Sequence, residues 1–346
     1  MVAEPRAPSS QTLRPALAPA AVLLPVLVVL LCIAAVFALA IGPARLSLHE
    51  IFGGLTGSNE TAAIIVREIR LPRLILSLSI GAMLGLAGAG IQGLSRNPLA
   101  EPAIIGTPQA AALGAVLTIY SGLADTFSFA LPIAAIAGAM ISMVITLAAV
   151  RRIGGVTSLL LIGLTLGSLA GSAISLVLSL SSNPYAVTEI VFWLMGSFAD
   201  RSMQHVVLSL PFIVVGAAAI LYCAPAYKAL TLGEDTAASL GFDVWRVSIL
   251  TAGGISLGVG AATAVAGAIG FVGLMAPHLA RPFLRSDPQR ILVPSALIGA
   301  LLTTTADILV RLIPSTSEIR VGALLAVIGA PCFLYLVIFR PYRLDN

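Results

Sequence analysis

The chain is dominated by long stretches that contain no Asp, Glu, Lys or Arg. A helix needs about 20 apolar residues to cross about 30 Å of hydrocarbon, and most of these stretches are long enough. They are residues 15–44, 74–95, 102–124, 126–150, 153–188, 202–227, 247–280, 291–306 and 321–339. An α-helix satisfies its backbone hydrogen bonds within one segment, as the interior of a lipid bilayer requires. The sequence therefore predicts an all-α membrane protein with a single polytopic domain, residues 1–346.

The number of crossings follows from the longest of these stretches. Residues 247–280 exceed one span and are interrupted by glycines, so we expect a full helix at 247–266 and a short helix at 271–284. Ten crossings then place both termini in the cytoplasm, with residues 1–16 as a cytoplasmic tail, in agreement with the positive-inside tendency. The short helix reaches only about 21 Å and must be shielded by protein.

Several functions are excluded by composition. Only 10% of the residues are charged, against about a quarter in soluble domains, and the scattered arginines argue against nucleic-acid binding. The single lysine, Lys228 in "PAYKALT", lies in no phosphate-binding loop. We therefore predict no catalytic site, no metal site and no cofactor bound by this chain. The histidines and cysteines lie in separate segments: His49, His205, His278, Cys32, Cys223 and Cys332.

Small residues recur at four-residue spacing on several predicted helices, which permits close approach of helix backbones. We interpret these stripes as packing within one bundle; the alternative is a subunit interface or a substrate pathway. They comprise Gly163, Gly167 and Gly171, Gly81 and Gly85, and Gly254 and Gly258.

The carboxylate most deeply embedded in an apolar segment is Asp307, in "LLTTTADILVRLI". An acidic group inside a membrane suggests a functional site, and a proton-coupled carrier would need one. Arg311 follows at i+4 spacing, where the two side chains can pair. We predict a structural ion pair between Asp307 and Arg311, with proton transport as the alternative.

A short polar helix interrupts the apolar pattern at "TLGEDTAASLG". Thr231 followed by Glu234 predicts an N-terminal capping box, and Gly241 is a C-cap candidate. The helix lies in a predicted cytoplasmic loop, residues 227–246. A second cytoplasmic feature is the turn "RNPLAEP", in which Pro98 and Pro102 separate two helices. This turn is either a structural feature or a contact with another subunit.

Five motifs, spread over residues 20–340, resemble one family. They are "REIRLPRLILSLSIGAMLGLAGAGIQGLSRNPLAEPAIIGTPQAAALGAV", "TLGEDTAASLGF", "AGAIGFVGLMAPHLAR", "ADILVR" and "VGALLAVIGAPCFLYLV". The chain is similar to the FecCD/BtuC-type permeases, the transmembrane subunits of ATP-binding-cassette importers for iron chelates, haem and cobalamin. The resemblance implies the type II importer fold, with ten transmembrane helices and a short eighth helix.

The resemblance also implies roles for three groups of residues. The polar helix would be the loop that couples to the ATPase subunit, and the cytoplasmic turn would be a second contact with it. Three arginines match those that receive glutamates of the binding protein in the family's cobalamin importer; local neutralisation by Glu68 and Asp307 is the alternative. The coupling residues are Thr231, Leu232, Gly233, Glu234, Asp235, Thr236, Ala237, Ala238, Ser239, Leu240 and Gly241; the turn comprises Arg96, Asn97, Pro98, Leu99, Ala100, Glu101 and Pro102; and the docking arginines are Arg70, Arg73 and Arg311.

The expected function is that of a permease subunit in the bacterial inner membrane, carrying an iron chelate such as a ferric siderophore or haem. Its expected partners are the lipid bilayer, a second copy of itself, a periplasmic binding protein and two ATPase subunits that hold ATP and Mg. The alternatives are a cobalamin permease, a secondary transporter driven by protons through Asp307, and a membrane protein with a structural or signalling role. The sequence does not identify residues that line the substrate pathway.

Overall fold

The computed structural model describes residues 17–44, 46–127, 129–284, 286–314 and 319–339. Over these ranges the chain forms helices and no strands. The helices are α1 (Leu17–Ala40), α2 (Leu48–Thr56), α3 (Glu60–Ala63), the π-helix η1 (Ile64–Arg70), α4 (Leu71–Ser95), the 3-10 helix η2 (Pro102–Ile105), α5 (Thr107–Tyr120), α6 (Leu123–Thr126), α7 (Ala130–Ile153), α8 (Val156–Leu180), α9 (Pro184–Leu194), α10 (Met203–Tyr222), α11 (Ala224–Leu230), α12 (Glu234–Ser239), α13 (Val244–Ala266), α14 (Val272–Leu284), α15 (Pro288–Leu312) and α16 (Val321–Phe339).

Each of the ten predicted crossings contains a helix. Seven helices are long and apolar enough to span a membrane: α1, the continuous run from α3 through α4, α7, α8, α10, α13 and α15. The shorter helices α5, α14 and α16 occupy the three other predicted crossings. The all-α, ten-helix fold is thus confirmed, and α9 is an additional helix. The predicted tail, residues 1–16, and Arg340 and Arg343 lie outside the described residues.

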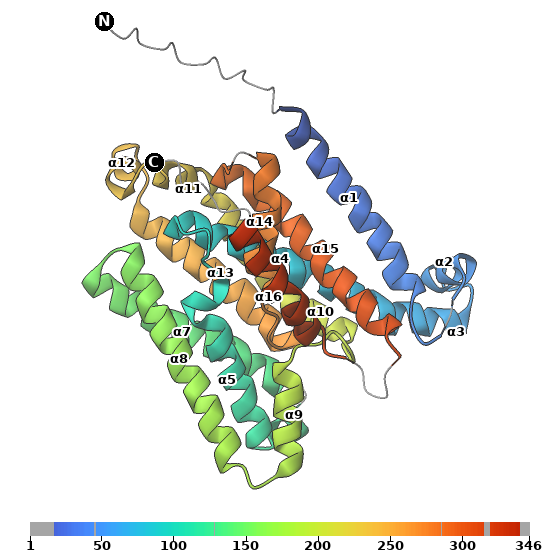
Figure 1. Cartoon of the computed structure of the whole chain (residues 1–346). Coiled ribbons are helices and arrows are strands. Elements are labelled where there is room, and N and C mark those ends of the chain that lie inside the picture. The colour runs from blue at the N-terminus through green and yellow to red at the C-terminus, as the bar shows by residue number, and fades with distance from the viewer. Residues whose placement is uncertain (1–16, 45, 128, 285, 315–318, 340–346) are drawn as a thin grey trace, which may run out of the picture.

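The most buried helices lie at the centre of the bundle (Figure 1). In the α3–α4 run and in α13, 78% of the most apolar window is buried inside the molecule, against 17% for α1 and 22% for α8. Figure 1 also shows α11 and α12 together at one end of the bundle, whereas α2 and α3 lie beside the far end of α1. The polar helix α12 is therefore carried on a terminal surface of the bundle.

Glycines allow the central helices to approach one another closely. A Cβ atom added to Gly81 would lie 2.5 Å from the carbonyl oxygen of Gly299 in α15, and one added to Gly254 would lie 2.7 Å from that of Gly216 in α10. Gly163 packs in the same way on η2, whereas Gly171 has nothing within 4 Å of its added Cβ. The packing interpretation of the stripes holds for these helices, except at Gly171.

The predicted interruption of the long apolar stretch lies between α13 and α14. Gly267 has φ +73° and ψ −168°, a backbone conformation open mainly to glycine, and Phe271 has φ +65°, so the chain leaves the helical conformation between α13 and α14. The carbonyl oxygen of Ala266 accepts a hydrogen bond from the backbone N–H of Ser197, 2.8 Å away. Gly273 lies inside α14 and not in the break. The split that was predicted from the glycines is confirmed, and the interruption runs from Gly267 to Phe271.

The contact between α4 and α14 yields a testable prediction. A Cβ atom on Gly88 would lie 1.7 Å from the carbonyl oxygen of Gly273, so Gly88→Ala forces two backbones apart. We expect a loss of about 1–3 kcal/mol, typical of overpacked cores, measured as a lower thermal midpoint of the purified protein. Gly171→Ala is the matched control and should leave the midpoint unchanged; an equal midpoint for both variants would contradict this packing.

Candidate functional site

Helix α12 begins later than the sequence suggested. Its N-cap is Gly233, with φ +104°, and the Thr231 hydroxyl donates instead to the carbonyl oxygen of Lys228, 2.7 Å away. The backbone N–H of Leu232 also bonds back, to the carbonyl oxygen of Ala229. Thr231 therefore belongs to the turn that closes α11, and the predicted capping box with Glu234 is wrong.

The C-terminal end of α12 is as predicted. Gly241 has φ +91°, and its N–H bonds to the carbonyl oxygen of Ala238 at 2.9 Å, while the N–H of Phe242 bonds to that of Ala237 at 3.1 Å. These two bonds define a Schellman motif with glycine in the left-handed position. The helix is therefore a short element with a fixed end.

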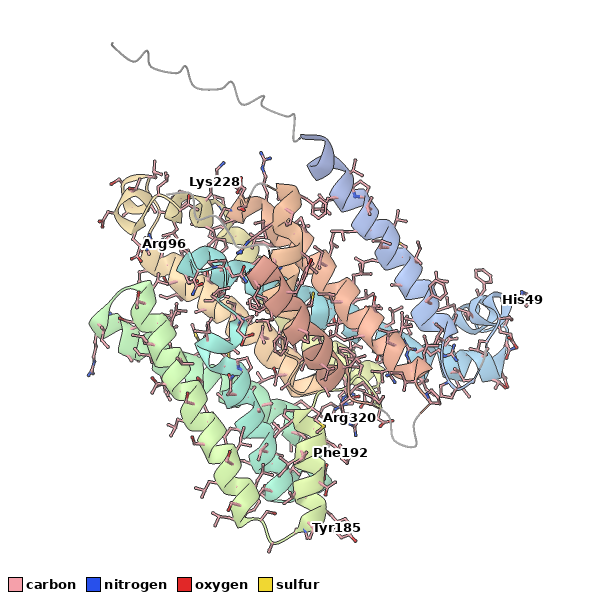
Figure 2. The ribbon with its side chains drawn as sticks, in the orientation of Figure 1. His49, Arg96, Tyr185, Phe192, Lys228 and Arg320 are labelled. Atoms are coloured by element: carbon pink, nitrogen blue, oxygen red, sulfur yellow. The ribbon has the colours of Figure 1, made fainter. Side chains whose placement is uncertain are left out.

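Most of the surface of α12 is exposed, with Glu234 half-buried. Ala237 is fully buried against the bundle, whereas Ala238 on the next position is exposed. Leu232 and Leu240 flank the helix, with exposed fractions of 65% and 59%. The structure thus places a small knob with exposed leucines on the same end of the molecule as Lys228 and Arg96 (Figure 2).

The cytoplasmic turn is linked to α12 by charge. Arg96 lies in the left-handed conformation that ends α4, and its Nη2 is 3.8 Å from Oε1 of Glu234. Residues 96, 97 and 99 are exposed and Pro98 is half-buried, but Ala100 and Pro102 are buried and Glu101 is turned inward. The exposed part of the turn is therefore Arg96–Leu99, and the predicted role of the turn as a subunit contact stays a prediction.

A buried polar relay joins the same turn to the short helix α14. Nε2 of Gln92 in α4 donates to the carbonyl oxygen of Ala100, 3.1 Å away, and Nη2 of Arg281 in α14 donates to Oε1 of Gln92. Sequence reasoning missed both side chains. The signal was present, because Gln92 is a polar residue inside an apolar, glycine-rich span, where such residues usually have a specific partner.

At the opposite end of the bundle, Asp307 forms the centre of a buried ionic cluster. Arg73 approaches its carboxylate with Nε and Nη2, both 2.8 Å from Oδ1, and Nη2 of Arg311 lies 2.9 Å from Oδ2. Asp307 is only 1% exposed. The predicted Asp307–Arg311 ion pair is therefore confirmed, and Arg73 is a second partner that was not predicted.

The arginines of this region also hold the C-terminal end of α1. Arg311 Nη1 donates to the carbonyl oxygens of Ala38 and Ile41, 2.8 and 3.0 Å away, and Arg70 Nη1 donates to that of Ala40 at 2.9 Å. Cations at the carbonyl end of a helix are stabilising. The side chains of the three predicted docking residues are therefore buried, and they bind groups of this same chain: Arg70, Arg73 and Arg311. The structure does not present them on the outer surface as docking groups.

The described residues contain no cluster of three or more His, Cys, Asp or Glu side chains that could hold a metal ion. His278 is a structural residue: its Nδ1 lies 2.9 Å from the carbonyl oxygen of Leu274, and its ring meets the ring of Phe333 edge-on at 5.2 Å between centroids.

Comparison with known proteins agrees with this arrangement of elements. The model of the FecCD transport family matches residues 28–339, and the chain belongs to this family. The Bacillus subtilis (strain 168) permease YvrB, an uncharacterised ABC transporter permease protein, is 38% identical over 86% of each chain. The Fe(3+)-citrate import permease YfmE of the same strain is 35% identical, over 91% of this chain and 94% of that protein.

Two further comparisons extend the relationship. The cobalamin import permease BtuC of Halobacterium salinarum (strain ATCC 700922 / JCM 11081 / NRC-1) is 39% identical, over 83% of this chain and 77% of that protein. A solved metal-chelate type ABC transporter in an inward-facing conformation superposes with a TM-score of 0.83 at 30% identity, and covers 92% of this chain and 99% of its own. The chain is therefore a multi-pass membrane permease of a FecCD-family ABC importer, and such permeases are not themselves catalytic.

Removing the central charge of the ionic cluster should destabilise the protein. Asp307→Asn leaves two buried guanidinium groups without a counter-charge, and we expect a loss of about 3–5 kcal/mol, measured by thermal or denaturant unfolding of the purified chain. The matched control is Asp243→Asn, because Asp243 and its partner Arg246 are largely exposed and asparagine retains the N-cap. Equal stability of the two variants would show that the cluster is not structural.

Proposed function

We propose that this chain is the inner-membrane permease subunit of an importer that acts as a homodimer with two separate ATPase subunits. The ATPase subunits bind and hydrolyse ATP with Mg, and a periplasmic binding protein delivers the cargo. Both termini then lie in the cytoplasm, on the side of α12. The assignment of sides is supported by the positions of Lys228, Arg96 and Arg246, which favour the cytoplasmic face.

The observation that carries this proposal is the knob formed by α12. It is short, capped at Gly241 and exposed, and it carries Leu232 and Leu240 in contact with water. We propose that Leu232 and Leu240, at the two ends of this short helix, belong to one docking surface and that it fits a cleft of the ATPase subunit.

Movement of α12 can reach the membrane helices through contacts within the chain. Arg96 links Glu234 of α12 to the cytoplasmic turn, and Gln92 and Arg281 link that turn to α14. These contacts support a continuous coupling route from α12 to α14. In this mechanism, ATP binding on the partner biases a helix bundle that has two stable arrangements, open to either side of the membrane.

Docking of the binding protein is proposed at the end that carries α2, α3 and the ionic cluster. In this proposal Arg70, Arg73 and Arg311 act from below the surface, because they hold α1, α4 and α15 in register. Direct ion pairs between these arginines and the binding protein would require the cluster to open. Exposed neighbours such as Arg67 and Glu68 are better placed for the first encounter.

The proposed cargo is an iron chelate, a ferric siderophore or haem, and cobalamin is the alternative. The iron assignment is supported by the Fe(3+)-citrate permease among the relatives, and the alternative by the cobalamin permease. Uptake into proteoliposomes that contain permease, ATPase and binding protein, measured with labelled chelates and labelled cobalamin, decides between them.

The docking role of α12 predicts the effect of one charged side chain. Ala238 is exposed, so Ala238→Arg should leave the chain folded but place a charge within the interface, where an unpaired charge is costly. We expect ATP-driven uptake to fall at least about tenfold, together with loss of ATPase co-purification. Ala238→Ser, which keeps the small size, is the control; normal uptake by Ala238→Arg would contradict the assignment.

The energy source separates the importer from a proton-driven carrier. The two carboxylate oxygens of Asp307 are bound by the guanidinium groups of Arg73 and Arg311, so the structure uses this side chain as the centre of an ionic cluster. We therefore expect uptake to continue when a protonophore collapses the proton gradient at constant ATP, and to stop when ATP is withheld. Collapse of uptake by the protonophore alone would instead support the secondary transporter.

A further inference from the structure

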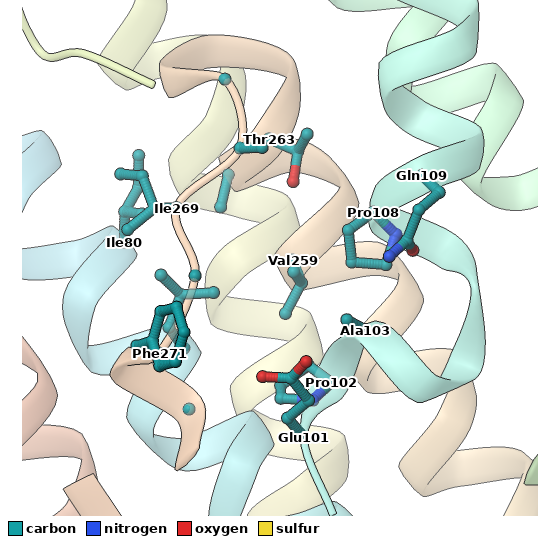
Figure 3. A pocket seen from close by; sticks show the side chains of 16 residues that line it. Ile80, Glu101, Pro102, Ala103, Pro108, Gln109, Val259, Thr263, Ile269 and Phe271 are labelled. Carbon is teal, nitrogen blue, oxygen red and sulfur yellow. The ribbon is translucent and has the colours of Figure 1, made fainter. Parts of the chain in front are cut away.

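Two interruptions of the helical structure border the same cavity. One is the break between α13 and α14, at Gly267–Phe271, and the other is the turn and 3-10 helix that lead into α5, at Glu101–Gly106. Together with α4 and α13 they enclose a cavity of about 170 Å³ (Figure 3). Irregular backbone within a membrane protein is tolerated where it lines a cavity, and broken helices mark the substrate sites of many transporters.

Glu101 is the ionisable side chain of this cavity. The other fifteen lining residues are apolar or uncharged, and all sixteen lie within the described ranges. Figure 3 shows the Glu101 carboxylate turned toward Phe271 and Val259 across the cavity. In the part of the chain that the structure describes, no cation and no hydrogen-bond donor contacts this carboxylate, and its burial raises the pKa of Glu101.

Glu101 is half-buried, and partial removal of a carboxylate from water without a partner carries a cost. The buried Asp307 is held by two arginines, and the half-buried Glu234 has Arg96. Glu101 has no such partner, although asparagine or glutamine would fit the same turn without the cost of burying a charge. The Glu101 carboxylate is therefore available to a group that enters the cavity.

The surroundings of the cavity place it beside two helices with exposed apolar faces. The residue that closes the 3-10 helix, Gly106, packs on α8, where an added Cβ would lie 2.1 Å from the carbonyl oxygen of Gly163. On the other side Phe271 packs on Gly329 of α16. Outward from these contacts, Leu164 in α8 and Val327 in α16 are exposed. The cavity thus lies between α8 and α16, each of which has an exposed apolar residue on its outer side.

We propose that Glu101 is a charge-selecting residue of the cargo pathway, which favours cargo with a cationic or hydrogen-donating edge and disfavours anionic cargo. The cavity volume of about 170 Å³ lies below the range of about 300–1,000 Å³ for sites that enclose a drug-sized ligand. The cavity therefore contacts one edge of the cargo and does not enclose the whole of it. The selection of cargo by charge rests on the proposed transport function. The effect of Glu101 on the electrostatic potential in the cavity does not depend on it.

The electrostatics are tested without any cargo. A cysteine is introduced at Ala103, which lines the cavity, in the complete chain after replacement of Cys32, Cys223 and Cys332 by alanine. Its rates of reaction with a cationic and an anionic methanethiosulfonate reagent of similar size are compared. We expect the ratio of cationic to anionic rates to fall about tenfold on Glu101→Gln, as the charge is removed at short range. Glu101→Asp should keep the ratio high.

A matched control removes a carboxylate that lies elsewhere. Glu189 is exposed on α9 and does not line the cavity, so Glu189→Gln should leave the ratio unchanged. A ratio that is the same with and without the Glu101 charge would overturn the proposal, as would an equal fall on Glu189→Gln.

The cargo is tested on the assembled importer with two ferric chelates of opposite charge. A cationic ferric trihydroxamate with a free amine and an anionic ferric tricatecholate are offered at equal concentrations. We expect Glu101→Gln to reduce the preference for the cationic complex severalfold, whereas unchanged selectivity would overturn the selecting role. If neither complex is imported even by the unchanged chain, these two chelates are excluded as cargo, and the thiol experiment still decides whether Glu101 sets the charge of the cavity.

Discussion

The close approach of α4 to α14 and α15 is the contact on which the rest of the bundle depends. Gly81, Gly85 and Gly88 each bring the α4 backbone against a backbone carbonyl of a neighbouring helix. Apolar side chains gain little by leaving lipid for another helix, so packing at short range is the main source of helix association in a membrane. Because α14 has only 13 residues, it is too short to span the bilayer alone and relies on this shield.

The charged side chains are buried at one end of the molecule and exposed at the other. Around Asp307 the arginines are buried, and each also binds carbonyl groups or the carboxylate at short distance, which makes that end rigid. At the α12 end, Arg96, Lys228 and Arg246 are exposed, and their ion pairs are 3.3–3.9 Å long. Exposed pairs contribute about 0–1 kcal/mol, so this end can exchange its partners at little cost when another subunit binds.

Local sequence rules predicted those features that depend on neighbouring residues. The pair Asp307 and Arg311 follows from one helical turn, the interruption after α13 from Gly267, and the end of α12 from Gly241. Arg73 could not be found in this way, because it lies 234 positions from Asp307 in the sequence. The predicted capping box does not form, because the Thr231 hydroxyl donates to the carbonyl oxygen of Lys228 in the turn after α11. The sequence could not predict that the Glu101 side chain turns inward, because a turn of a few residues contains both exposed and buried positions.

The backbone of Phe271 has a consequence for the balance between conformations. A residue other than glycine with φ +65° is strained by about 1–2 kcal/mol, and Phe271 is kept there by its packing against Gly329 of α16. A displacement of α16 would allow this residue to return to ordinary dihedral angles and release that energy. The observed arrangement therefore contains local strain at Phe271, and its population relative to other conformations depends on the position of α16.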